Sequence, residues 1–189
     1  LILINPVFVI LSCPSTYHLK YSKLLIEAGI PVLIEKPISS NYEDAKLIYD
    51  LAIKNKTRTQ VGYCLRYLSS AMYIKENLVD EINNNLISVY VNCSSYLPEW
   101  RETDWRRSVS SNKSLGGGVL LELSHEIDLL FFLFGDIHLE WSHIAKTNFL
   151  ELDVEEHASA VFLTQSNNPI YMDLNFCQKA LKRVIEFNT

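Results

Sequence analysis

Apolar residues in the first third of the chain form short continuous runs separated by segments of helical periodicity. The runs at residues 7–11 and 32–34 predict strands that are buried on both faces, and residues 59–63 predict a third strand. Apolar side chains recur at helical spacing over residues 17–28, and again over residues 40–52, which a Ser-x-x-Glu capping box opens. Strands that alternate with helices over short connections are typical of a parallel α/β sheet.

The pattern changes near residue 65. Residues 67–82 predict a helical segment, after which apolar and polar side chains alternate over residues 87–93 and 170–177. Alternation with a period of two predicts strands with one buried face and one face in water, as in antiparallel sheets. We therefore predict two domains: residues 1–65 with a parallel sheet, and residues 66–189, an α+β domain with an open-faced, predominantly antiparallel sheet.

Composition and charge narrow the range of partners. The chain has 17 Lys and Arg against 22 Asp and Glu, a net charge of −5. Because there is also no basic stripe, we expect no nucleic-acid partner and no membrane-surface partner. The apolar start of the chain is shorter than the roughly 20 residues that a membrane span needs. The cysteines lack CxxC spacing, which predicts no metal site and reduced, buried thiols in a cytoplasmic protein: Cys13, Cys64, Cys93 and Cys177.

Lys36 is the first candidate for chemistry. It follows the buried strand predicted at residues 32–34, and ligands of open α/β sheets gather at the carboxyl ends of the strands. A lysine in that place, between Glu35 and Pro37, can donate a proton or stabilise an oxyanion. A surface lysine at the mouth of a loop is the alternative, and this tripeptide alone does not decide between them.

The segment GGGVLLELSHEIDLLFFLFG, residues 116–135, is the second candidate. At 100° per residue, Glu122, His125 and Asp128 share one broad side of a helix. A histidine beside carboxylates that orient its ring is suited to general acid–base catalysis. The alternative is a structural histidine whose carboxylate neighbours only solvate the helix. The glycines at 116–118 permit a close backbone approach by a ligand or another segment.

Four quoted stretches, taken in order, carry a family resemblance: VILSCPSTYHLKYSKLLIEAGIPVLIEKPIS, VGYCLRY, WRETDWRRSVSSNKSLGGGVLLELSHEIDLLFFLFG and MDLNFCQKALKRVIEF. Together they resemble the glucose–fructose oxidoreductase/inositol dehydrogenase/MocA (Gfo/Idh/MocA) family of nicotinamide-dependent oxidoreductases. The resemblance implies a Rossmann domain followed by an α/β domain that carries the substrate site. Because the chain has no GxGxxG motif, we expect residues 1–65 to be the second half of the Rossmann domain, and the end of the chain to be clipped.

The resemblance also implies a set of site residues. The catalytic residues would be Lys36 and His125, with Glu122 as a third candidate. The cofactor, NAD or NADP, would contact Ser12, Pro14, His18, Glu35, Lys36, Pro37, Trp105 and Arg106. The sugar-like substrate would contact Lys36, Arg66, Tyr67, His125 and Asp128. The Lys36–Pro37 bond is often cis in such proteins.

Two positions depart from the family pattern. Cys64 stands where the family usually has an asparagine, and Leu121 replaces a carboxylate that is often found four residues before the histidine. Glu122, one position later, has a longer side chain than aspartate and could reach the site. These departures bear on the acid–base relay and on the class of substrate.

The resemblance implies hydride transfer between nicotinamide and a hydroxyl-bearing carbon of a sugar, sugar derivative or cyclitol. His125 would move the hydroxyl proton, and Lys36 would hydrogen-bond the same oxygen. The alternative is a non-catalytic sugar- or nucleotide-binding regulatory relative. We also expect a homo-oligomer, a dimer or tetramer, formed through the outer face of the open sheet.

Overall fold

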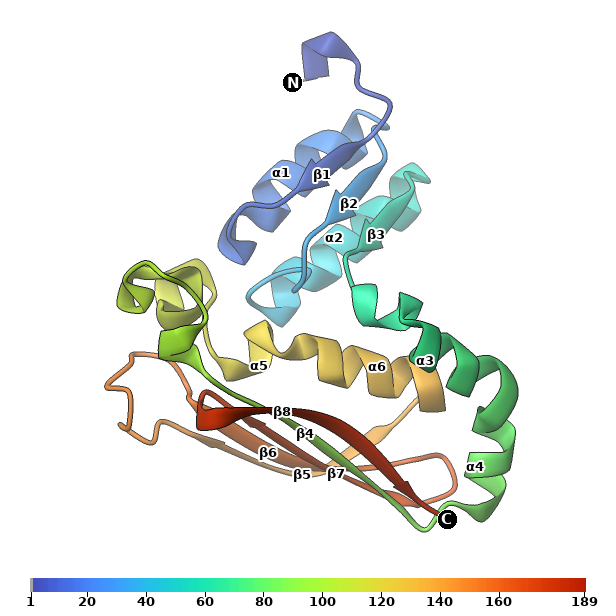
Figure 1. The fold of residues 1–189 in the computed structure, drawn as a ribbon. Helices are drawn as coiled ribbons and strands as arrows, with labels where there is room; N and C mark the ends of the chain where they lie inside the picture. Colours follow the sequence, from blue (N-terminus) through green and yellow to red (C-terminus); the bar gives the residue numbers. More distant parts are fainter. Residues whose placement is uncertain (1) are drawn as a thin grey trace.

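The computed structural model describes residues 2–189, which form two β-sheets joined by helical segments (Figure 1). The first sheet is parallel, with the strand order β1-β2-β3. Its elements are, in chain order, η1 (Ile2–Ile4), β1 (Val9–Leu11), η2 (Ser15–Tyr17), α1 (His18–Glu27), β2 (Val32–Ile34), α2 (Tyr42–Asn55) and β3 (Thr59–Val61).

Helices α1 and α2 pack against each other on one side of this sheet. Right-handed crossovers between neighbouring parallel strands place both helices there, and Ile26, Ile34 and Ile48 are fully buried between the layers. The expected burial of the first strand on both faces is wrong, because Ile10 is 54% exposed. β1 is the edge strand, so the described residues give it one neighbouring strand and a helix layer on one face only.

The cap of α2 lies one residue later than the sequence predicts. Asn41, and not Ser40, is the N-cap, and its side chain accepts a hydrogen bond from the backbone N–H of Asp44 at 2.8 Å. Glu43 and Asp44 in the first turn favour the positive end of the helix dipole. The helix itself is therefore confirmed, with a different capping residue.

The second sheet has the order β5-β6-β7-β4-β8. Three of its four pairings are antiparallel, and β4 pairs with β7 in parallel. The elements are η3 (Cys64–Tyr67), α3 (Ser69–Tyr73), η4 (Ile74–Leu78), α4 (Val79–Asn85), β4 (Ser88–Tyr96), η5 (Leu97–Glu99), η6 (Trp105–Arg107), η7 (Val109–Ser111), η8 (Lys113–Leu115), α5 (Val119–Glu122), α6 (Ser124–Phe134), β5 (His138–Ala145), β6 (His157–Leu163), β7 (Pro169–Asn175) and β8 (Cys177–Asn188). The predicted fold class, a partial Rossmann sheet followed by an α+β domain, is confirmed. A domain boundary at residue 65 stays a prediction.

Helices cover only one of the two faces of the second sheet among the described residues (Figure 1). Figure 1 shows α5 and α6 over one face, and apolar residues such as Val91 and Met172 are buried beneath them. No helix among residues 2–189 covers the opposite face, on which Tyr90 stacks on Tyr171 at 4.9 Å between ring centroids and Trp141 is 53% exposed. The period-two alternation of the sequence is thus the signature of a sheet packed on one side.

Glycines 116–118 let the loop before α5 fold tightly on itself. A Cβ on Gly117 would lie 2.3 Å from the backbone oxygen of Val109 and 2.6 Å from that of Ser110. Gly118 is the N-cap of α5 and has a φ of 120°, which side-chain-bearing residues rarely adopt. The close approach that the sequence predicts is therefore present, and the protein's own backbone makes it at Gly117.

Two further expectations concern thiols and membranes. All four cysteines are free, but Cys64 is exposed, so the expected burial is wrong for that residue. Among residues 2–189, no helix has both the length and the apolar character that crossing a membrane requires.

We expect Gly117→Ala to destabilise the protein by about 3 kcal/mol, because the new methyl group meets two backbone oxygens that cannot rotate away. Urea unfolding of both proteins measures the difference. Gly29→Ala is the control: Gly29 has a φ of 70° but no atom within 4 Å of an added Cβ, so it should lose only about 1 kcal/mol. Equal losses in the two variants would contradict the packing argument.

Candidate active site

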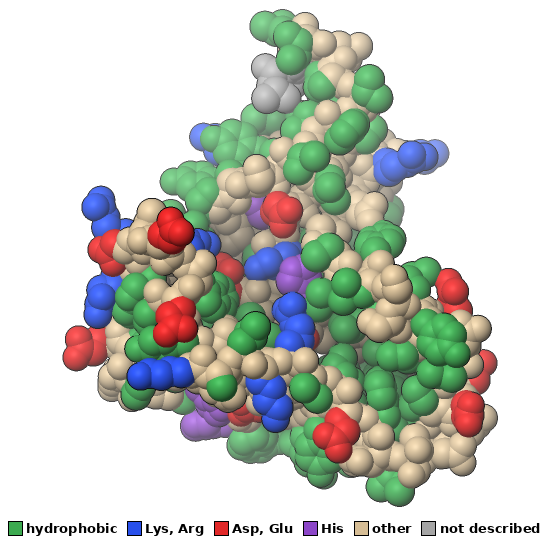
Figure 2. All heavy atoms as spheres, in the orientation of Figure 1, with side chains coloured by type: hydrophobic (Ala, Val, Ile, Leu, Met, Phe, Trp, Pro, Cys, Tyr) green, Lys and Arg blue, Asp and Glu red, His purple; other side chains and the backbone are tan. Residues whose placement is uncertain are grey.

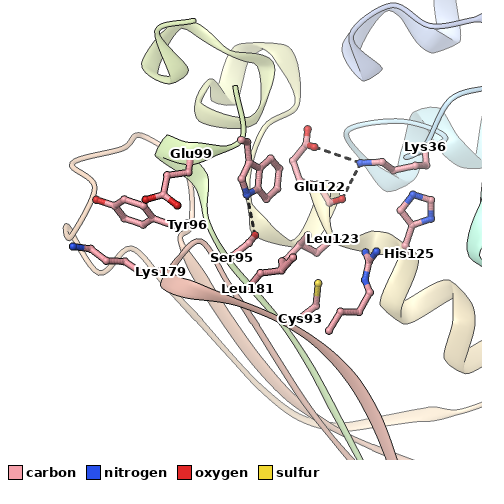
Figure 3. Close-up of a pocket in the computed structure, with 12 residues that line it drawn as sticks. Lys36, Cys93, Ser95, Tyr96, Glu99, Glu122, Leu123, His125, Lys179 and Leu181 are labelled. Atoms are coloured by element: carbon pink, nitrogen blue, oxygen red, sulfur yellow. Dashed lines mark hydrogen bonds and ion pairs between the residues drawn. The ribbon is translucent and has the colours of Figure 1, made fainter. Parts of the chain in front are cut away.

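A cavity of about 560 Å³ lies where the first sheet meets the second part of the chain. Figure 2 shows a hollow there, in which basic and histidine side chains gather, and Figure 3 shows the cavity in close-up. It is lined by Lys36, Cys93, Ser95, Tyr96, Glu99, Trp100, Glu122, Leu123, His125, Lys179, Leu181 and Arg183. The three catalytic candidates from the sequence are therefore brought together.

Lys36 reaches the cavity from the carboxyl end of β2. Its Nζ donates a hydrogen bond to the backbone oxygen of Glu122 at 2.8 Å and lies 3.4 Å from Oε2 of the same residue (Figure 3). Only 18% of the Lys36 side chain and 15% of the Glu122 side chain are exposed. The Lys36–Pro37 bond is cis, as the resemblance implies. The ammonium is thus held across the gap between the two parts of the chain.

His125, in the first turn of α6, faces the same cavity. Its ring meets the edge of Tyr63, with 5.7 Å between centroids. Burial lowers the pKa of His125, and the cations of Lys36 and Arg183 lower it further. Nδ1 is buried and has no hydrogen-bond partner among the described residues. Both effects favour the neutral imidazole, which is the form that can accept a proton.

Asp128 does not share this cavity. The helix breaks at Leu123, so Glu122 ends α5 while Asp128 lies on α6 and forms an ion pair with Arg66, 2.7 Å from Nε and 2.5 Å from Nη2. Arg66, Tyr67 and Asp128 line a separate cavity of about 330 Å³. These three predicted substrate residues therefore line a different cavity from Lys36 and His125, although Asp128 is close enough for its charge to act on His125.

Ser12 and Glu35 lie at the carboxyl ends of the first two strands. They directly follow β1 and β2, both are exposed, and the backbone N–H of Glu35 donates to Leu11 at 2.9 Å, which aligns the two strand ends. Ligands of such sheets bind at these strand ends. Pro14 and Pro37 lie in the loops that continue from the same ends, Pro14 half-buried and Pro37 buried.

His18, Trp105 and Arg106 are placed differently. His18 is 1% exposed, and its ring nitrogens lie 3.0 Å from the backbone oxygen of Pro37 and 2.9 Å from that of Cys13. It therefore ties two loops together, and its contact with the cofactor stays a prediction. The Arg106 guanidinium stacks 4.4 Å above the Trp105 ring, and neither residue lines the cavity of Lys36 and His125.

Sequence reasoning missed an ion pair in the wall of this cavity. Arg183 on β8 donates from Nε to Glu126 on α6 at 2.9 Å, and the Glu126 side chain is 1% exposed. Cys93 lies beside them: burial raises the pKa of its thiol to about 11, and the Glu126 carboxylate contributes to the rise. The available signal was the carboxylate at position 126 in a mainly apolar helix, but its partner lies 57 residues away in the sequence.

Two family models match the chain. "Oxidoreductase family, NAD-binding Rossmann fold" matches residues 3–63, and "Oxidoreductase family, C-terminal alpha/beta domain" matches residues 77–185. The chain belongs to the Gfo/Idh/MocA oxidoreductase family. It spans between 38% and 42% of the length of the first three curated relatives it matches.

Known relatives of this Gfo/Idh/MocA chain include sugar dehydrogenases. It is 28% identical to the glucose-6-phosphate 3-dehydrogenase of Bacillus subtilis over 141 residues, 74% of this chain and 40% of that protein. WlbA dehydrogenase from Bordetella pertussis, solved with NADH and UDP-GlcNAcA, superimposes with a TM-score of 0.84 at 20% identity, over 97% of this chain and 53% of that one. Levoglucosan dehydrogenase, solved with NADH and levoglucosan, gives 0.82 at 16% identity over 97% and 52%. These two likenesses show the fold.

We expect Lys36→Met to raise the pKa of His125, because it removes a cation that disfavours the imidazolium. Burial and Arg183 remain and continue to lower the pKa. A pH titration of the His125 ring signals by NMR measures the change. Lys146→Met, in the exposed pair with Asp153, is the control and should leave the His125 titration unchanged. An unchanged pKa in Lys36→Met would contradict the geometry.

Proposed function

We propose that the protein containing this chain is an NAD- or NADP-dependent oxidoreductase that transfers a hydride between nicotinamide and a hydroxyl-bearing carbon of a sugar, sugar derivative or cyclitol. The observation that carries the proposal is the meeting of Lys36 and His125, 89 positions apart in sequence, in one cavity. Relatives that are sugar dehydrogenases support this class of substrate.

His125 accepts the hydroxyl proton as the carbon is oxidised and returns it in the reverse direction. Its lowered pKa keeps the base form available at neutral pH, so the rate of oxidation falls as the pH drops through that pKa, below 6.5. Lys36 donates a hydrogen bond to the same oxygen and stabilises the negative charge that develops on it.

Glu122 acts through Lys36. Its backbone oxygen and carboxylate hold the Lys36 ammonium in place. Of the three predicted catalytic residues, we therefore assign Glu122 the role of positioning Lys36. The nicotinamide cofactor, when bound, supplies the two-electron acceptor or donor. Ser12 and Glu35, at the strand ends beside Lys36, are the residues that would face it.

In the full-length protein we expect His125→Ala to lower kcat/KM by about 10²- to 10⁴-fold, because proton transfer loses its base. Lys36→Ala should also lower it strongly. NAD⁺ and NADP⁺ reduction across a panel of sugars and cyclitols measures both. Lys23→Ala, on the exposed face of α1, is the matched lysine control. Activity that survives both cavity substitutions would rule out the proposed mechanism, and would favour a binding role instead.

We further propose that the protein is a homo-oligomer, a dimer or tetramer, joined through the outer face of the second sheet. The exposed aromatic side chains Tyr90, Trp141 and Tyr171 on that face support it, since large exposed apolar patches commonly mark interfaces. Its cytoplasmic location stays a prediction from the sequence.

Trp141→Asp should shift the protein toward monomer, because a carboxylate would be buried without a partner in the joined face. Light scattering coupled to size-exclusion chromatography measures the mass. Tyr49→Asp, at a 61%-exposed aromatic residue on α2, is the control and should keep the wild-type mass. A wild-type protein that is monomeric would end this proposal.

A further inference from the structure

The ion pair of Arg183 and Glu126 has no part in the proton and hydride transfers proposed above. Glu126 is buried to 1% exposure, whereas 47% of the Arg183 side chain is exposed. Arg183 approaches the same oxygen, Oε1, with Nε at 2.9 Å and Nη2 at 2.7 Å. A carboxylate buried this far is stable only when it is paired, so Glu126 fixes both the place and the orientation of the guanidinium.

Arg183 is also directed toward the reacting groups. It lies opposite Cys93 in the register of β4 and β8, on the sheet face that α6 covers, and it lines the cavity with Lys36 and His125. A guanidinium has five N–H donors. Since Glu126 occupies only one edge of the fork, the remaining donors are available to a molecule in the cavity.

Charge is balanced at this end of the cavity. Lys36 is paired with Glu122, and Arg183 with Glu126. Lys179 and Glu99 also line the cavity, but Lys179 is four residues from Arg183 along β8, about 13 Å in an extended strand. A substrate carboxylate beside His125 would therefore compete with Glu126 for Arg183 and add an uncompensated negative charge. A hydroxyl group accepts the same hydrogen bonds without adding charge.

We propose that Arg183 is a substrate-binding residue that donates hydrogen bonds to neutral hydroxyl oxygens next to the reacting carbon, and that Glu126 sets this preference by neutralising the guanidinium. Glu126 is thus a positioning residue that determines specificity for charge: the site accepts polyhydroxylated, uncharged rings and rejects a carboxylate there. The inference deepens the proposed function and rests on it for the view that the substrate is sugar-like.

Glu126→Gln tests the proposal, because it keeps the size of the side chain and removes the negative charge that neutralises Arg183. The probes are D-glucose and D-glucuronate, measured by isothermal titration calorimetry on the full-length protein with NAD⁺. We expect the wild type to prefer glucose, and Glu126→Gln to shift the ratio of the two Kd values at least tenfold toward glucuronate. Glu186→Gln is the matched control. It removes the same charge from the same strand, opposite Tyr90 on the outer face, and should keep the wild-type ratio.

The inference would be overturned by an unchanged ratio in Glu126→Gln, by no glucuronate binding in that variant, or by an equal shift in Glu186→Gln. A wild type that prefers glucuronate would also overturn it. Turnover separates this inference from the proposed function. If glucose binds but no NAD⁺ is reduced under any condition, the proposed oxidoreductase activity fails while the charge preference stands.

A charge-neutral double variant covers the case in which Glu126→Gln fails to fold. Glu126→Gln with Arg183→Gln leaves neither buried carboxylate nor free guanidinium, and thermal melting checks that it is folded. We expect it to bind glucose at least tenfold more weakly than the wild type, with no gain in glucuronate binding. Wild-type affinity for glucose in this variant would show that Arg183 does not bind the substrate.

Discussion

The hydrogen bond from Lys36 to the backbone of Glu122 is the contact on which the site depends. It joins residues 86 positions apart and brings the end of a parallel strand to the last residue of α5. Because its main acceptor is a backbone oxygen, which any residue supplies, the contact does not require a carboxylate at a particular position. The departure at Leu121, which raised a question about the relay, therefore leaves the anchoring of the ammonium intact.

The same contact shapes the electrostatics of the cavity. Lys36 and Arg183 both disfavour the charged form of His125, while Asp128 and Glu35 act more weakly in the opposite sense. Each of the two cations has its own carboxylate partner, so the two ion pairs add little net charge to the cavity. The cationic groups nevertheless lie close to His125, and they favour its neutral form. This combination suits proton transfer from a hydroxyl group, since the base stays free and the oxygen that loses its proton meets donors.

The sequence predicts the strands better than the contacts between them. Residues 32–34 form β2 as expected, because a short apolar run between a glycine-ended helix and a proline has few alternatives. The helix break at Leu123 was not predicted, because the sequence has no glycine or proline there to mark it. Lys36 and His125 could be found because both lie in motifs with a family resemblance. Arg183 and Glu126 could not be paired, because their meeting depends on the register of β8 against β4, which side-chain periodicity does not specify.

His18 connects the turn that carries Lys36 to the start of helix α1. Its ring spans the backbone of Cys13 on one side and that of Pro37 on the other, from the first residue of α1. Since the ring is rigid and buried, it holds these two backbone segments at a fixed separation. A tilt of α1 against the sheet would therefore move the backbone of Pro37 through this imidazole. The Lys36 ammonium group would then shift away from the backbone oxygen of Glu122.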